Sequence, residues 1–425
     1  MLKRFGATKV VLGLLCLMYF ITYIDRVNYS TASIAFETEF GLSKKDIGFA
    51  FSVFGYPYLI FQIFGGWLGD RFGPRMTLTV CSMIWAGATF ATGFVESFTG
   101  LIIARLFLGL GEGATFPTAT RAMSGWTPTS ERGFAQGITH AFARIGNTVT
   151  PYLVTGLIAA WSWRGSYFII GTVSLVWALV WLFYFRNHPA DHPDITEAEL
   201  QKLPPQRGRQ MVNVPWMPLF RRMLPVTIVY FCYGWALWLF LSWIPQYFEH
   251  GYHLKLKDTA FFATSVFLAG VIGDSLGGTL SDWILKRTGN VKLARRNMVA
   301  VCLLGALLSL LPMLRFHDLT TSTICLSAGF FFIEMTIGPM WAIPMDIAPA
   351  YSGTASGFMN SGSALAAIIS PVVAGWMIDE TGNWDLPFLC SIVLLGVGVV
   401  LSFTMHPERR FDSAPLPGAG AAVGG

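Results

Sequence analysis

The segment Gly66-Trp67-Leu68-Gly69-Asp70-Arg71-Phe72-Gly73-Pro74-Arg75 has a counterpart later in the chain, Gly278-Thr279-Leu280-Ser281-Asp282-Trp283-Ile284-Leu285-Lys286-Arg287. Asp282 comes 212 positions after Asp70 in a chain of 425 residues, an interval close to half of the sequence. Such a repeat indicates two halves of common origin. Within each copy, glycine lets helices pack closely, aspartate ends a helix, and basic residues suit a helix carboxyl end beside anionic lipid.

The composition of the whole chain indicates that its solvent is a lipid bilayer. Hydrophobic residues make up 53% of the sequence and charged residues 12%, and the mean hydropathy is +0.54. Soluble domains carry about 25% charged residues, so this chain has too little polar surface for a water-soluble globule. The composition therefore argues against a nucleic-acid binder, a secreted disulfide scaffold and a soluble enzyme. The six cysteines lie in apolar runs without metal or redox spacing, so we expect neither a metal nor a cofactor.

Apolar runs predict an all-α membrane protein with twelve transmembrane helices. The helices form two six-helix halves, residues 1–186 and 223–411, joined by a polar, proline-rich cytoplasmic linker at 187–222. Residues 412–425 are rich in alanine, glycine and proline, which is typical of a disordered tail. The predicted spans are 10–31, 47–68, 76–95, 100–122, 133–160, 166–185, 223–248, 258–281, 297–315, 322–345, 353–377 and 384–405.

Lysine and arginine residues are distributed unequally between the two sides of these spans. Twenty lie on the side of the amino terminus, six on the opposite side and three within spans. Because basic loops stay in the cytoplasm, both termini and the linker should be cytoplasmic. We therefore expect a multi-pass protein of the cell inner membrane whose first helix is not cleaved as a signal peptide.

Several motifs resemble those of the Major Facilitator Superfamily and, over nearly the whole chain, those of its anion:cation symporter family. The resemblance implies the major facilitator fold and a carrier of the kind that moves sugar acids, tartrate or phthalate, without identifying the substrate. The motifs in the first half are Tyr23-Ile24-Asp25-Arg26-Val27-Asn28, Gln62 with Gly65-Gly66, and Arg105-x3-Gly109-x-Gly111-Glu112-Gly113-x3-Pro117. Those in the second half are Gly338-Pro339-x-Trp341-x2-Pro344 and Gly353-Thr354-Ala355-Ser356-Gly357-x2-Asn360.

Charged side chains inside the predicted spans need a partner, water or a task, because charge in hydrocarbon is costly. Arg105 and Glu112 are seven residues apart and share a helix face. Two interpretations are open: a structural ion pair, or a Glu112 that takes and releases a proton under the control of a nearby arginine. The resemblance favours the second and implies that Asp25 and Glu112 couple transport to protons. The seven charged residues are Asp25, Arg26, Arg105, Glu112, Arg144, Asp274 and Glu334.

Arg26 shares a helix face with Tyr23, whereas Asp25 points about 100° away. A buried arginine offers a rigid fork for a carboxylate, although a neighbouring acid such as Asp25 can equally neutralise it. The resemblance implies that Arg26 binds the anionic head of the substrate, with Tyr23 and Tyr58 beside it. It also implies that Trp341 and Asn360 line the cavity, although for Trp341 a core packing role stands as the alternative.

The fifth span departs from the family pattern at His140 and Arg144, which lie four residues apart on one helix face. If this face lines the cavity, a second arginine opposite Arg26 suits a compact dianion: a dicarboxylate, an aromatic diacid or a sulfonated acid such as sulfoacetate. Alternatively, Arg144 pairs with Asp274 of the eighth span and His140 only packs. Glu334 of the tenth span is open to two interpretations, a second proton site or a structural partner, and we favour the structural one.

These features predict a secondary active transporter that imports a small organic anion by proton symport with alternating access. An exchanger or uniporter for a sugar acid and a non-transporting membrane sensor are the alternatives. Motifs for ATP hydrolysis or a zinc active site are absent from the sequence, so we do not expect an enzyme. The expected partners are the anion, protons and the bilayer, without nucleic acid, and the expected chain is a monomer. The residues assigned gating or structural roles are Arg105, Asp70, Arg71, Asp282 and Arg287.

Overall fold

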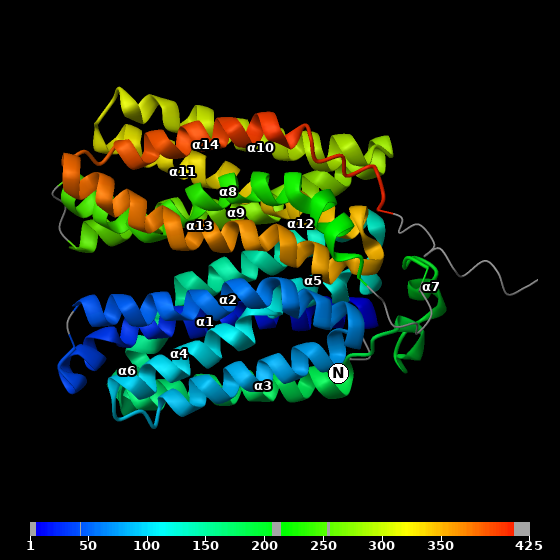
Figure 1. Cartoon of the computed structure of the whole chain (residues 1–425), viewed down its shortest axis with the longest axis horizontal. Coiled ribbons are helices and arrows are strands. Elements are labelled where there is room, and N and C mark those ends of the chain that lie inside the picture. The colour runs from blue at the N-terminus through cyan, green and yellow to red at the C-terminus, as the bar shows by residue number, and fades with distance from the viewer. Residues whose placement is uncertain (1–5, 43, 206–213, 253–255, 412–425) are drawn as a thin grey trace, which may run out of the picture.

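The computed structural model describes residues 6–42, 44–205, 214–252 and 256–411. In these ranges all regular secondary structure is helical, and the long helices run side by side in two bundles (Figure 1). Helices α1 to α6 form one bundle and helices α8 to α14 form the other. The predicted all-α fold with two six-helix halves is confirmed.

The first bundle contains six long helical segments, which we call rods. The labelled helices do not correspond to these rods one to one, because α4 and α5 form one rod and α6 forms two. Ala114 interrupts the fourth rod between α4 and α5, and Ser162 (φ 78°) breaks α6 into two rods at a backbone angle that is uncommon for a non-glycine residue. This break lies between the fifth and sixth predicted spans. The helices are α1 (Ala7–Phe40), α2 (Lys44–Phe72), α3 (Pro74–Thr92), α4 (Phe98–Gly113), α5 (Thr115–Trp126) and α6 (Arg132–Tyr184).

The second bundle repeats this arrangement. A π-helical turn, η4 (Leu293–Asn297), leads into the ninth rod, and the tenth rod is interrupted at Thr336 between α11 and α12. The interruptions of the fourth and tenth rods occupy corresponding places in the two halves, as expected for a repeat. The helices are α8 (Trp216–Gly251), α9 (Leu256–Thr288), α10 (Met298–Leu310), α11 (Leu319–Met335), α12 (Ile337–Ile347), α13 (Ser352–Thr381) and α14 (Leu386–Ser402).

Hydropathy alone identifies fewer spans than the fold contains. Seven stretches of the described chain are long and apolar enough to cross a membrane, and α14 is a shorter apolar helix. Helices α2 and α9 fall outside this set because they carry glycine, serine and charged residues. These two helices pack across the contact between the bundles, α2 against α13 and α9 against α6. Their buried polar residues, such as Gln62 and Asp274, face protein, while apolar side chains such as Ile60 and Ile272 stay exposed.

The linker and both ends of the described chain lie at one end of the molecule, which we call the linker end (Figure 1). Thr8 donates two hydrogen bonds to Glu199 of α7 (Glu197–Leu200), and Phe411 donates its backbone N–H to Ile347. Partial burial opposes ionisation of Glu199, but hydrogen bonds from Thr8 and Thr196 outweigh it and lower the pKa of this carboxyl. Helix α8 already begins at Trp216, inside the predicted linker, and the predicted tail at 412–425 lies outside the described residues.

Two glycine contacts bring the bundles together near the linker end. A Cβ atom on Gly66 of α2 would overlap the carbonyl oxygen of Gly353 on α13, and one on Gly278 of α9 would overlap that of Gly133 on α6. Only glycine allows these backbones to approach so closely. Both contacts belong to the sequence repeat, so the repeat encodes the surfaces that join the halves.

The Gly66 contact generates a first prediction. Gly66→Ala should separate the bundles at the linker end, because overpacking such a contact costs about 1–3 kcal/mol. Ser124 of α5 and Ser352 of α13 lie 3.0 Å apart between their hydroxyl oxygens, so cysteines at both positions should form a disulfide in this closed arrangement. In a background without the native cysteines, we expect Gly66→Ala to slow this cross-linking about tenfold.

The matched control is Gly87→Ala, since a Cβ atom on Gly87 of α3 meets no atom within 4 Å. This variant should cross-link like the parent protein. Equal cross-linking in the Gly66 and Gly87 variants would show that the glycine contact does not hold the linker end closed.

Candidate functional site

A small cavity lies between the two bundles, at the middle of the helices. Its free space is about 30 Å³, enough for a water molecule or two. All seven residues predicted to bind substrate line it: Tyr23, Arg26, Tyr58, His140, Arg144, Trp341 and Asn360. Their placement agrees with a binding site, while their roles stay predictions. The other lining residues are Phe116, Tyr230, Tyr233, Leu237, Trp238, Ile337, Ser363 and Ala364.

Arg26 of α1 is held by one carboxylate and surrounded by aromatic rings. Its Nε lies 2.6 Å from Oε2 of Glu112, and its guanidinium carbon lies 4.8–5.4 Å from four ring centroids. The rings attract the cation and exclude water, which strengthens the ion pair. The Nη2 group of Arg26 is buried without a hydrogen-bond partner among the described residues. The rings belong to Tyr23, Phe54, Tyr58 and Phe116.

Glu112 therefore pairs with Arg26 rather than with Arg105, its neighbour on the same helix face. Arg105 donates its Nε to the Ala50 carbonyl at 3.2 Å, and its guanidinium carbon lies 4.4 Å from the Tyr29 ring centroid. The helix-face argument placed Arg105 and Glu112 correctly on α4 but could not show that α1 brings a closer cation.

Asp25 lies behind Arg26, away from the cavity lining. It accepts hydrogen bonds from the hydroxyls of Thr89 on α3 (2.9 Å) and Ser174 on α6 (3.2 Å). Only 2% of Asp25 is exposed, so the surrounding protein shields its carboxyl from bulk water. Asp25 and Glu112 are thus two buried carboxyls, and only Glu112 pairs directly with Arg26.

Arg144 of α6 reaches both the cavity and the second bundle. Its Nη2 lies 3.1 Å from Oε1 of Glu334, and its Nε lies 3.8 Å from Oδ2 of Asp274. Its guanidinium carbon also lies 5.6 Å from the Tyr23 ring centroid, the same ring that Arg26 contacts at 4.9 Å. The two interpretations of Arg144 are therefore compatible, because one side chain lines the cavity and pairs with acids.

His140, Trp341 and Asn360 are each fixed by a hydrogen bond. The Nδ1 of His140 must donate to the Gln136 carbonyl (2.9 Å), since a carbonyl only accepts. Trp341 donates to the Tyr230 hydroxyl at 2.7 Å, and the Asn360 amide donates to Gln62 of the other bundle at 2.7 Å. Trp341 is both packed and part of the cavity wall, so its two interpretations also hold together.

Two aspartates, one from each copy of the repeat, join the bundles at the linker end. We call these contacts, made by Asp70 and Asp282, the latches. Asp70 of α2 accepts the backbone N–H groups of Gly353 (3.0 Å) and Thr354 (2.6 Å) in the first turn of α13. Asp282 of α9 accepts those of Gly133 (3.1 Å) and Phe134 (2.6 Å) in the first turn of α6. Each carboxylate thus satisfies free N–H groups at a positive helix end in the opposite bundle.

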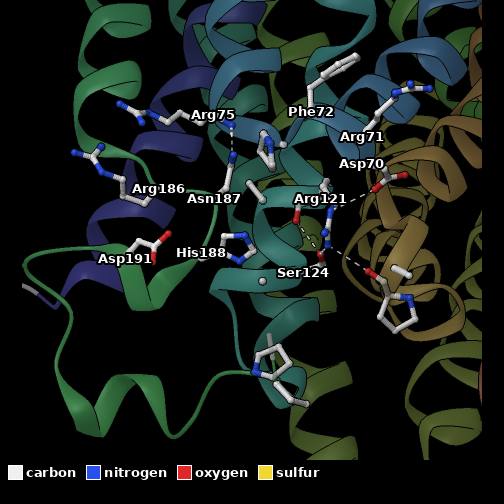
Figure 2. A pocket seen from close by; sticks show the side chains of 18 of the residues that line it. Asp70, Arg71, Phe72, Arg75, Arg121, Ser124, Arg186, Asn187, His188 and Asp191 are labelled. Carbon is white, nitrogen blue, oxygen red and sulfur yellow. Dashed lines mark hydrogen bonds and ion pairs between the residues drawn. The ribbon is translucent and has the colours of Figure 1, made fainter. Parts of the chain in front are cut away.

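The arginines that support these latches differ from the predicted ones. Arg121 lies 3.4 Å from Asp70, and Arg295 lies 2.9 Å from Asp282. Arg71 and Arg287 instead stack on Trp67 and Trp283 of their own helices. Figure 2 shows Arg71 directed away from the contact between Asp70 and Arg121. The sequence motif identified the two aspartates. Its basic residues Arg71 and Arg287, however, contact tryptophans of their own helices and not these carboxylates.

Asp346 extends the second latch and was not anticipated from the sequence. It lies 3.1 Å from Arg295 and 2.9 Å from Arg132 of the other bundle. These arginines were counted only as cytoplasmic charges, which gave no signal of a buried role. Tyr230 was missed as well, because tyrosines in a chain with many aromatic residues carry no local signature.

A larger cavity, of about 430 Å³, lies at the linker end beneath the linker (Figure 2). Its arginines are engaged with the protein itself. Arg75 donates to the Leu182 carbonyl, Arg186 donates to carbonyls at the end of α6, and Arg121 donates to the Pro349 carbonyl. These arginines therefore hold parts of the protein together around the cavity, which we interpret as a structural feature under the linker.

The chain belongs to the Major Facilitator Superfamily, whose sequence profile matches residues 15–371 and, in a second match, 295–423. The probable sulfoacetate transporter SauU of Cupriavidus necator is 48% identical over 417 residues, which cover 97% of each chain. The hexuronate transporter of Bacillus subtilis is 28% identical over 378 residues, covering 87% of this chain and 88% of that relative. These matches confirm the resemblance identified from the motifs.

Among solved structures, the Escherichia coli fucose:proton symporter FucP superposes with a TM-score of 0.72. The match covers 94% of this chain and 99% of FucP at 16% identity, so it shows the fold alone. The protein is a multi-pass membrane transporter and not an enzyme, as predicted.

The second latch generates a prediction. Asp282→Asn should weaken closure, because buried hydrogen bonds to a charged group contribute about 1.5–3 kcal/mol each. We expect cross-linking between cysteines at positions 124 and 352 to slow about tenfold. Glu131→Gln is the control, since it removes the exposed Lys286–Glu131 contact (3.5 Å) between the same two bundles. Slowing in both variants would trace the effect to surface charge rather than to the latch.

Proposed function

We propose that this transporter imports a compact organic dianion, of the class of sulfoacetate, together with protons. The observation that carries the proposal is the pair Arg26 and Arg144, which approach one aromatic ring and line one cavity. Each has a buried N–H group without a hydrogen-bond partner in the described chain, on Arg26 Nη2 and on Arg144 Nη1. Two guanidinium groups with free donors suit two anionic heads of one small molecule.

The relatives support an anionic substrate of this kind. The name of the relative that is 48% identical specifies sulfoacetate. This compound carries a carboxylate and a sulfonate, which a single carbon atom separates. The name of a relative that is 28% identical specifies hexuronate, which is a monoanion. A second cavity arginine favours the dianion for this chain.

Competition for Arg26 supplies the proton coupling in this proposal. Glu112 pairs with Arg26 Nε at 2.6 Å in the present arrangement, so an incoming carboxylate or sulfonate at Nη2 competes with Glu112 for the same positive charge. A displaced, ionised Glu112 would remain buried with too little compensation, and protonation removes that cost. Anion binding and proton binding therefore favour each other. Asp25, beside the same arginine, accepts a proton through its hydroxyl contacts.

Under this proposal the proton gradient drives import, and the state with a closed linker end receives the anion. The excess of lysine and arginine at that end supports a cytoplasmic location and insertion in the inner membrane. The anion then enters from the opposite side while both latches are closed, and it leaves after the latches part. The two bundles would move about the central cavity, as in alternating access.

Glu112→Gln tests the coupling. Glutamine cannot carry the proton, so proteoliposomes containing this variant should lose sulfoacetate accumulation driven by a pH gradient, at least tenfold, while exchange of internal for external sulfoacetate continues. The control is Glu39→Gln, which removes an exposed ion pair with Arg164 far from the cavity. If the Glu112 variant still accumulates sulfoacetate uphill, Glu112 is not the coupling carboxyl. If the parent protein ignores the pH gradient, it is an exchanger or uniporter.

Arg144→Gln tests the preference for a dianion. A ligand at 100 times its Kd stabilises a protein by about 2.7 kcal/mol, which a thermal-shift measurement in detergent detects. We expect sulfoacetate to raise the melting temperature of the parent protein and of Arg164→Gln, a surface control, more than gluconate does. In Arg144→Gln the two anions should act alike. An undiminished sulfoacetate shift would leave Arg144 without a role in binding.

A further inference from the structure

Three charged side chains, which we call the Arg144 triad, meet where α6, α9 and α11 pack beside the central cavity. Arg144 comes from the first bundle, and Asp274 and Glu334 come from the second. Arg144 lies 3.1 Å from Glu334 and 3.8 Å from Asp274, and neither carboxyl has exposed side-chain surface. The triad is therefore a buried group of charges that spans the contact between the halves.

The triad has two carboxyls for one guanidinium. With both carboxyls ionised it would hold an uncompensated negative charge in a medium of low dielectric, which is strongly unfavourable. Tyr233 of α8 lies near both carboxyls, and Tyr23 and Tyr230 lie near Arg144, but none of these brings a positive charge. His140 is buried and one helical turn from Arg144, and both burial and the nearby guanidinium disfavour a second cation at this histidine.

The contacts distinguish the two carboxyls. Glu334 accepts a hydrogen bond from Arg144 Nη2 at 3.2 Å, which makes it the ion-pair partner. Neither oxygen of Asp274 has a hydrogen-bond partner among the residues that the structure describes. We infer that Asp274 is a further proton-binding site of the transporter, occupied by a proton whenever the triad is assembled.

This inference rests on the proposed function and adds a proton carrier in the second half of the molecule. Asp274 contacts the first bundle closely, since its carbonyl oxygen occupies the place where a Cβ atom on Gly137 would lie. When the linker end opens, α6 leaves α9, and Asp274 loses Arg144 and gains water. Its proton then passes from the carboxyl oxygen to the cytoplasmic solution. On closure, a proton from the outer solution restores the neutral triad.

The test counts protons per anion. Proteoliposomes containing the purified protein receive sulfoacetate, and potassium with valinomycin holds the membrane voltage at zero. At equilibrium, the logarithm of the accumulation ratio rises with the imposed pH difference, and the slope equals the number of protons moved with each anion. We expect Asp274→Asn to lower this slope by one relative to the parent protein, because asparagine resembles the protonated acid and carries no proton.

Glu334→Gln provides a second, independent variant. It leaves Arg144 and Asp274 as a balanced ion pair, so Asp274 should be ionised throughout and the slope should again fall by one. A role limited to packing would change the transport rate or the stability but not the slope. Glu39→Gln should keep the slope of the parent protein.

The outcomes separate this inference from the proposed function. A parent slope of one or more that stays unchanged in Asp274→Asn and Glu334→Gln would overturn the Asp274 site and leave proton symport standing. A parent slope of zero would overturn proton symport, and the Asp274 site with it. If Asp274→Asn does not fold, the slope of Glu334→Gln decides.

Discussion

A charge buried in hydrocarbon must be neutralised within the protein, and this requirement determines how the helices of this transporter meet. Arg26 of α1 finds Glu112 of α4, and Arg144 of α6 finds Glu334 of α11. Each pair joins different helices, so the ionisation of a carboxyl depends on where another helix stands. On the proposed function, the ion pairs themselves are therefore sufficient to link the movement of helices to the movement of protons.

The same requirement explains the closed linker end. Asp70 and Asp282 are buried carboxylates at corresponding ends of α2 and α9, and each is satisfied by the first turn of a helix in the opposite half. Arg121 and Arg295 complete the neutralisation. Because the two contacts derive from one repeated segment, the halves close on one another with nearly the same chemistry at two places.

The sequence predicted the fold well, because a bilayer imposes long apolar helices and a half-chain repeat is visible without a structure. Helical spacing placed Tyr23 with Arg26 and His140 with Arg144 on shared faces, but only the family resemblance implied a cavity beside Tyr23, and lining by His140 and Arg144 was one of two open alternatives. The sequence did not predict that Glu112 meets Arg26, because spacing within one helix says nothing about which residue of another helix lies opposite. Arg295 and Asp346 were missed for the same reason, since burial at a helix end depends on contacts distant in sequence.

The ring of Tyr23 lies against both cavity arginines, 4.9 Å from Arg26 and 5.6 Å from Arg144. An aromatic ring is rigid, so both guanidinium groups pack against one surface of fixed shape. On the proposed function, the positions of the two arginines then select substrates by their length. A dianion whose charged ends match the separation of the two guanidinium groups can contact both arginines, whereas a longer homologue must bend, and a shorter ion reaches only one. Selectivity by molecular length thus follows from the placement of two charged side chains against one uncharged ring.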